Sequence, residues 1–99
     1  MTVNVAVVMG VVVGAVQRID VPRDRGPGAR FSLSVRSGDP ALAICQDALV
    51  DVLAFERRAE VVLATLRVGA QVLVKGRLLS LDGAVLLQAD WIEVVRGGR

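Results

Sequence analysis

The chain has 99 residues, of which 54% are hydrophobic and 22% charged. This length suits one small domain, and the composition is too apolar for a disordered chain. Histidine is absent and Cys45 is the single cysteine, so a zinc site, a disulfide framework, a Ser-His-Asp triad and a Cys-His pair are excluded by count. We therefore expect no enzyme activity, no metal, no cofactor and no small-molecule substrate.

The charges nearly balance, with 12 basic against 10 acidic residues and a net charge of +2. Such a weak overall field permits a nucleic-acid partner without requiring one, so any attraction must come from local clusters of cations. Valine supplies 20 residues and aromatic side chains only three. This mixture favours β-strands over helices.

The longest apolar stretch, Val5 to Val16, is interrupted by Gly10 and Gly14. It is shorter than the roughly 20 residues of a membrane-spanning helix, and no basic segment precedes it as in a secretory signal. We expect a cytoplasmic protein with no membrane partner.

The first half of the chain predicts two strands joined by a basic loop. Val3 to Val16 is rich in β-branched residues and predicts a long strand bent at a glycine. From Gln17 to Arg30 the chain contains prolines and glycines, which predict an irregular loop that either binds an anion or is simply solvated. Its cations are Arg18, Arg23, Arg25 and Arg30. Strict alternation from Arg30 to Arg36 then predicts a second strand whose core side is Phe31, Leu33 and Val35.

Ser37 to Pro40 predicts a break, and Ala41 to Ala48 a moderately apolar connection. A third strand is predicted from Leu49 to Phe55, with alternate residues on opposite sides. The side predicted to face the core is Val50, Val52 and Ala54, and the outer side is Leu49, Asp51, Leu53 and Phe55.

The second half predicts a helix followed by a hairpin. Ala59, Val62, Leu63 and Leu66 have the spacing of an amphipathic helix that Gly69 would stop. Val72 to Leu81 predicts a fourth strand with a bulge or close backbone approach at Gly76. Asp82-Gly83 is a strong hairpin signal, and Ala84 to Val95 predicts the fifth strand.

Trp91 alternates with Val85, Leu87 and Ala89 along the fifth strand. We therefore expect its ring on the inner side, at the barrel end or in a seam between subunits, rather than stacked on a base.

This order of elements predicts an all-β domain over residues 1–96, with residues 97–99 as a frayed end. Five strands with one short helix between the third and fourth are the order of the OB-fold, a five-stranded Greek-key barrel that commonly binds oligonucleotides or oligosaccharides.

The same segments resemble the bacterial single-stranded DNA-binding proteins along nearly the whole chain. Val3-Asn4 with Val7-Val8-Met9-Gly10 is similar to that family's opening strand, and the segment 29–35 is similar to its second strand. The third strand and helix resemble the family at 50–55, 59–60 and 66–69. Val72 to Leu78, with Gly76 and a basic residue after it, resembles the fourth strand.

The resemblance implies an OB-fold that assembles as a homotetramer of paired dimers, commonly through the first strand, with single-stranded DNA wrapped over its outer surface and no catalysis. It implies a stacking role for Phe55 and DNA contacts for Arg57 and Arg18. Leu49, however, stands where the family commonly has a stacking Trp, and Asp51 where a cation is common. The Asp82-Gly83 hairpin is short, and no acidic tail follows.

Two functions remain open. The first is binding of single-stranded DNA without strong sequence preference, in replication, repair or recombination, by a homo-oligomer (tetramer or dimer). Stacking and phosphate contacts would come from Phe55, Arg57, Arg18, Arg23, Arg25 and Arg30, together with Lys75 and Arg77 beside Gly76. The alternative is a protein-interaction or assembly module with little nucleic-acid affinity, since Leu49, Leu53, Leu79 and Leu81 would form an apolar outer surface that suits a protein partner, and Asp51 would repel DNA.

Overall fold

The computed structural model describes residues 3–20, 26–39, 41 and 44–97, with backbone alone at 37–39 and 44–46. Five strands and one helix follow one another along the chain. They are β1 (Ala6–Ile19), β2 (Gly28–Asp39), β3 (Ile44–Phe55), α1 (Glu56–Thr65), β4 (Gln71–Leu81) and β5 (Ala84–Arg96).

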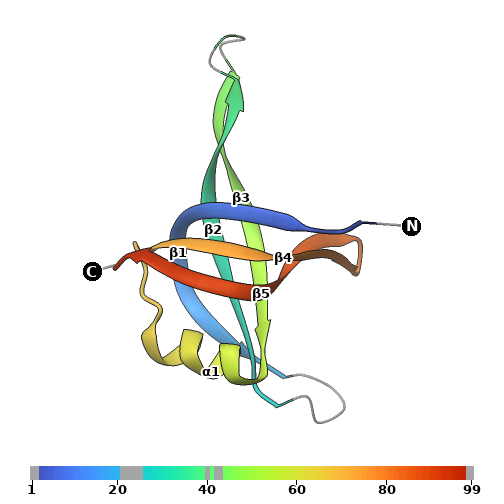
Figure 1. The fold of residues 1–99 in the computed structure, drawn as a ribbon, viewed down its shortest axis with the longest axis vertical. Helices are drawn as coiled ribbons and strands as arrows, with labels where there is room; N and C mark the ends of the chain where they lie inside the picture. Colours follow the sequence, from blue (N-terminus) through green and yellow to red (C-terminus); the bar gives the residue numbers. More distant parts are fainter. Residues whose placement is uncertain (1–2, 21–25, 40, 42–43, 98–99) are drawn as a thin grey trace.

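The strands form a closed barrel in the order β1-β2-β3-β5-β4 (Figure 1). All neighbouring strands are antiparallel except β3 and β5, which pair in parallel at Val52↔Leu87 and Leu53↔Gln88 and so close the barrel. Helix α1 stands between β3 and β4 in the chain. The predicted OB-fold is confirmed.

The barrel is filled by alanine, valine, leucine and phenylalanine side chains from every strand and from α1. Phe31 and Leu33 on β2 and Val52 and Ala54 on β3 are at most 2% exposed, as their alternation predicted. Val35 and Val50 pack against this core from its margin. Burial of apolar side chains contributes roughly 1.5–3 kcal/mol for each large residue, so this alternation is the main reason for the fold.

Two glycines allow the barrel to bend and close. Gly14 has a φ of 75°, and the β1–β2 register shifts between Val13 and Gln17, which gives the bend predicted for the first strand. At Gly76 an added Cβ would lie 1.9 Å from the carbonyl oxygen of Gln88. The predicted close approach at Gly76 is therefore confirmed, and no other residue fits there.

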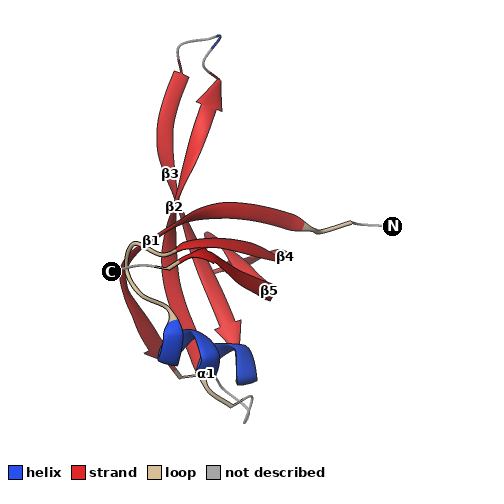
Figure 2. Cartoon of the chain, turned by 60° about the vertical axis from the view of Figure 1, so that its left-hand side comes forward, coloured by secondary structure: helices blue, strands red, loops and turns tan. Residues whose placement is uncertain are grey.

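The connection between β2 and β3 differs from the prediction. β2 continues to Asp39 and β3 begins at Ile44, so the two strands form a long hairpin through the expected break and connection. Its outer part projects from the barrel, opposite the end where α1 lies (Figure 2). Continuous pairing from Gly28↔Phe55 to Asp39↔Ile44 outweighs the local turn signal at Ser37-Gly38, because ladder hydrogen bonds satisfy the backbone.

Helix α1 ends earlier than expected. The chain leaves the helix at Leu66, which has extended backbone angles, while Gly69 lies in the following turn with a φ of 89°. The Gly69 amide donates to the carbonyl of Val12, so this glycine directs the chain back to β1 rather than stopping the helix. Among the described residues, no helix is long and apolar enough to cross a membrane.

Trp91 lies on the outside of the barrel, and the prediction of an inner position is wrong. Gly76 pairs with Ala89 and Lys75 with Trp91, which leaves Asp90 as an extra residue in β5. This bulge reverses the side to which later residues point. Ala89 is therefore 4% exposed but Trp91 is 59% exposed.

Replacement of Gly76 by alanine tests the close approach. We expect Gly76→Ala to lower the free energy of unfolding by about 1–3 kcal/mol, because the methyl group would overlap the Gln88 carbonyl and push β4 from β5. Gly97→Ala is the control, since nothing lies within 4 Å of the position that its methyl group would take. Urea unfolding of both variants measures the difference, and equal stabilities would contradict the assignment.

Candidate functional site

A row of side chains crosses four strands on the outside of the barrel and carries two of the predicted cations. Each member is the cross-strand partner of the next, in the order Arg30, Leu53, Gln88 and Arg77. We call these four residues the basic row. Three strand spacings of about 4.8 Å place the Cα atoms of its two arginines roughly 14 Å apart along the surface.

One end of the basic row is an ion pair. The Arg30 guanidinium donates to Asp51 Oδ2 at 2.6 Å, and the Ser32 hydroxyl donates to Asp51 Oδ1 at 2.6 Å. The hydroxyl and the guanidinium together hold the pKa of Asp51 below its ordinary value. Asp51 was expected to repel an anion, but the structure places it as the partner of Arg30, so each reduces the other's effect on a bound phosphate.

At the other end, Arg77 is exposed and has a looser partner. Its Nε lies 3.9 Å from Asp90 Oδ2, the carboxylate of the bulge residue. Lys75 is two residues away on the same side of β4 and is also exposed. The structure therefore brings both predicted β4 cations onto the surface that carries the basic row. Asp90 was not identified from the sequence, because the bulge that exposes it depends on β4.

Phe55 lies beside the basic row, two residues after Leu53 on the same strand. It is partly buried and stands outside the main core cluster. Its cross-strand partner is Gly28, which has no side chain to cover the ring. Glu56 then turns the chain into α1 with a φ of 59°.

The other predicted cations lie apart from the basic row or outside the described residues. Arg57 is exposed on the first turn of α1, two residues after Phe55. Arg18 belongs to β1 rather than to a loop, and it lines a shallow depression together with Asp20 and Glu60, whose charges oppose its own. Arg30 likewise belongs to a strand, while Arg23 and Arg25 lie outside the described residues.

The four-leucine outer surface does not form as predicted. Leu49 is 71% and Leu81 51% exposed, but Leu53 is only 5% exposed. Leu53 lies where β3 is paired on both sides, so Arg30 and Gln88 flank it and cover it. A protein-binding surface built on Leu53 is therefore excluded.

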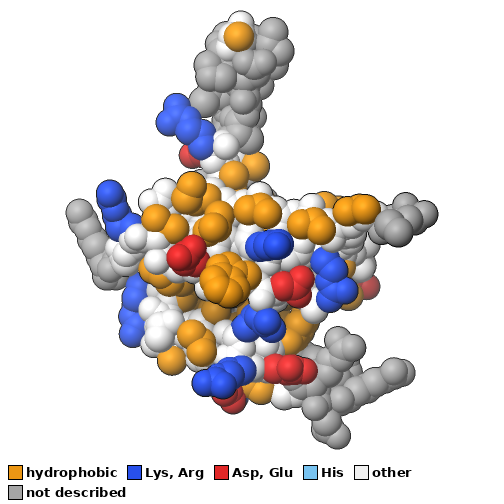
Figure 3. All heavy atoms as spheres, in the orientation of Figure 1, with side chains coloured by type: hydrophobic (Ala, Val, Ile, Leu, Met, Phe, Trp, Pro, Cys, Tyr) orange, Lys and Arg blue, Asp and Glu red, His pale blue; other side chains and the backbone are white. Residues whose placement is uncertain are grey.

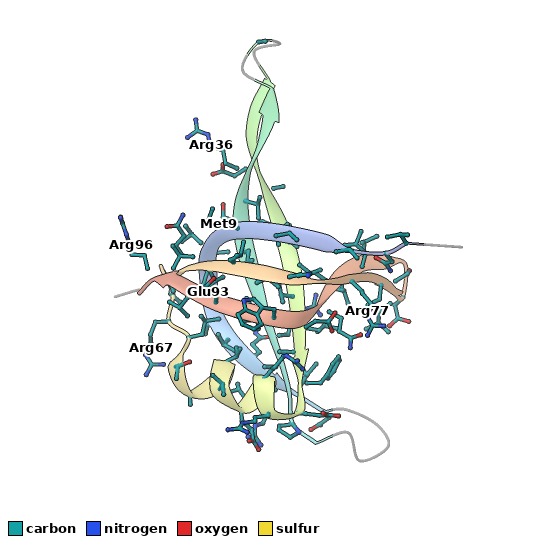
Figure 4. The ribbon with its side chains drawn as sticks, viewed as in Figure 1. Met9, Arg36, Arg67, Arg77, Glu93 and Arg96 are labelled. Atoms are coloured by element: carbon teal, nitrogen blue, oxygen red, sulfur yellow. The ribbon has the colours of Figure 1, made fainter. Side chains whose placement is uncertain are left out.

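The exposed hydrophobic side chains instead gather over β1, β4 and β5, with charged groups among them (Figure 3). Val7 pairs with Lys75 and Lys75 with Trp91, so these three form a second row across the sheet. Met9 and Glu93 lie in the next row, which Leu73 joins. Figure 4 shows Arg77 on this barrel face, whereas Arg36 lies on the projecting hairpin.

The described residues hold no group of three or more side chains able to bind a metal ion. The pKa of Asp51 is lowered by its two partners, the Ser32 hydroxyl and the Arg30 guanidinium. The arrangement can bind an extended anion that also presents flat apolar groups.

No protein-family model matches the sequence, and no curated protein matches it. Solved structures do match. A small single-stranded DNA-binding protein from Streptomyces coelicolor superposes with a TM-score of 0.76 at 25% identity, covering 95% of this chain and 93% of that one. The SSB domain of a Synechococcus protein superposes with a TM-score of 0.73 at 18% identity, covering 94% of this chain and 97% of that one.

The mitochondrial single-stranded DNA binding protein Rim1 of S. cerevisiae gives a TM-score of 0.80 at 13% identity, with 99% of this chain and 100% of that one covered. The resemblance seen in the sequence is therefore confirmed. This chain resembles a short, divergent member of the single-stranded DNA-binding proteins in fold and extent.

The Asp51 ion pair predicts a limited pH dependence of stability. Because folding lowers the pKa of Asp51 from 3.8, the pair stabilises the fold at pH values above that and is lost as the pH falls through the folded value. We expect Asp51→Asn to cost at most about 1 kcal/mol at pH 7, since water screens both partners. Urea unfolding from pH 7 to pH 3 should show this difference shrink below about pH 4. A difference that grows in acid would contradict the assignment.

Proposed function

We propose that this protein binds single-stranded DNA, with little sequence preference, across the outer surface of its barrel. The observation that carries the proposal is the end-to-end likeness to the Streptomyces single-stranded DNA-binding protein. The basic row and Phe55 lie on the outside of the same barrel. In this proposal the protein is cytoplasmic, has no catalytic activity and takes part in DNA replication, repair or recombination.

Binding combines two kinds of contact. Arg77, Lys75 and Arg57 attract phosphates, and their attraction releases counterions from the strand. Phe55 offers one partly exposed ring, and a stacked base contributes about 1–3 kcal/mol. Arg30 contributes less than a free cation because Asp51 shares its charge. We therefore expect weak binding that depends strongly on salt.

Titration with a dye-labelled oligo-dT tests the proposal. Anisotropy should show a complex at low salt that weakens as salt is added. Arg77→Ala should weaken binding and lower the slope of log K against log salt by about 0.7, the contribution of one phosphate contact on a single strand. Arg36→Ala, on the projecting hairpin, is the matched control and should leave the slope nearly unchanged.

Absence of a complex with the wild-type protein at low salt would overturn the proposal. Equal salt-dependence slopes for Arg77→Ala and the wild type would show that Arg77 does not contact the DNA. Titrations with oligo-dU and oligo-rU, which differ only in the 2′-hydroxyl, show whether the sugar is discriminated.

We further propose that two copies associate through β1. Over Ala6 to Gly10 this strand pairs with β4 only, and its β2 partners begin at Val11. One backbone edge therefore has no strand partner among the described residues, and a second β1 can pair with it. Asn4 holds the preceding segment in line, since its amide Nδ2 donates to the Leu78 carbonyl at 2.7 Å and its Oδ1 accepts from the Leu78 amide at 2.9 Å.

The outer side of this segment is apolar. Val3, Val5, Val7 and Met9 are 50–77% exposed. Pairing at the edge would cover part of them, and further pairing of dimers would give a tetramer.

Substitution of Val7 by lysine tests this edge. Sedimentation should show the wild type as a dimer or tetramer and Val7→Lys with a lower mass, because a lysine on a strand edge opposes pairing. Val85→Lys, at a residue that is 67% exposed on β5, should keep the wild-type mass. A monomeric wild type would contradict self-association.

A further inference from the structure

Arg30 carries a flat guanidinium group on the outside of β2, and Asp51 holds that group in place. Its Nη2 donates to Asp51 Oδ2 at 2.6 Å, and the Ser32 hydroxyl donates to the other carboxylate oxygen at 2.6 Å. The N–H groups of a guanidinium lie in its plane, so this contact uses an edge of the group and neither of its faces. The Arg30 side chain is 43% exposed. Part of a flat group in a fixed orientation is therefore accessible to a ligand.

The Arg30 side chain lies across the barrel surface. Its cross-strand partner is Leu53, whereas Asp51 lies two residues earlier on β3. To reach the Asp51 carboxylate, the side chain must cross from β2 to β3, and Leu53 beside it is only 5% exposed. The outer side of the Arg30 side chain is therefore directed toward solvent.

Phe55 is the other flat group at this place. Arg30 pairs with Leu53 and Gly28 with Phe55, so Arg30 and Phe55 are diagonal neighbours on one side of the sheet. Such neighbours are about 7–8 Å apart, and Gly28 has no side chain to separate them. Neighbouring bases of one strand can therefore lie against the Phe55 ring and the Arg30 guanidinium.

The Asp51 carboxylate determines which part of a nucleotide fits against Arg30. A phosphate would lie near this carboxylate as well, and the two anions would compete for one guanidinium. A base is uncharged, so it can lie on the guanidinium while the ion pair stays intact. Guanidinium planes of arginine are a surface on which bases of single strands stack. The ion pair therefore favours a base over a phosphate at this position.

We infer that the Arg30 guanidinium, held by Asp51 and Ser32, is a base-stacking site beside Phe55 and binds a base rather than a phosphate. This inference rests on the proposed function and adds a subsite to it. Asp51 and Ser32 are positioning residues, because they act through the guanidinium.

Replacement of Arg30 by lysine tests the site, because it keeps a positive charge beside Asp51 and removes the flat group. Anisotropy of a labelled oligo-dT of about 16 nucleotides should show binding that is weaker by roughly 3- to 10-fold. The slope of log K against log salt should not change, since no phosphate contact is lost. Arg36→Lys, on the projecting hairpin, is the matched control and should bind as the wild type does.

An oligonucleotide of the same length in which every nucleotide is abasic isolates the contact with the base. It keeps the phosphates and lacks the bases. Arg30→Lys and the wild type should bind it equally at low salt, so the difference seen with oligo-dT should disappear.

A double variant, Arg30→Met with Asp51→Asn, removes the flat group and both charges together. It should bind oligo-dT more weakly than the wild type with the same salt slope, which excludes an effect of an unpaired Asp51 charge. Urea unfolding of each variant shows whether it is folded under the conditions of the titration.

The two oligonucleotides separate failure of this inference from failure of the proposed function. Equal affinity of Arg30→Lys and the wild type for oligo-dT overturns the stacking site and leaves DNA binding intact. Equal losses by folded Arg30→Lys on both oligonucleotides, or a lower salt slope for the double variant, would make Arg30 a phosphate contact and also overturn the inference. No complex between the wild type and oligo-dT overturns both.

Discussion

The barrel depends on the parallel pairing of β3 with β5, through Val52↔Leu87 and Leu53↔Gln88. On the inside, Val52 and Leu87 are fully buried, so this short contact seals the core. On the outside, Leu53 and Gln88 join the arginines of β2 and β4 into one row. Closure of the core and continuity of the basic surface therefore have the same physical cause.

The arginines on that surface differ in how close a carboxylate lies to each of them. Asp51 lies against Arg30 at 2.6 Å, Asp90 lies 3.9 Å from Arg77, and Arg57 has no ion-pair partner among the described residues. Coulomb attraction falls with distance and with exposure to water. A bound phosphate would therefore meet no competing carboxylate at Arg57 and the strongest competing carboxylate at Arg30. On the proposed DNA surface, the cation on α1 is therefore less neutralised than the two arginines of the basic row.

Sequence patterns predicted the elements that depend on neighbouring residues. The alternation of Phe31 and Leu33 gave the buried side of β2, and Asp82-Gly83 predicted a turn in which both residues have positive φ. Sequence patterns failed where pairing with a neighbouring strand determines the side to which a residue points. Trp91 follows the period of Leu87 and Ala89, yet a bulge opposite Gly76 turns its ring outward, and no local signal reports an extra residue at Asp90.

Local patterns in the chain were sufficient to predict five strands, one helix and the type of fold, because the alternation of buried and exposed side chains is a local property of a strand. They also identified most of the cations on the proposed surface. Three features became visible only in the folded barrel: which cations lie in one row, that Asp51 neutralises Arg30, and that Leu53 is covered while Trp91 is exposed. These features depend on strand register, which is set by contacts between residues far apart in the chain.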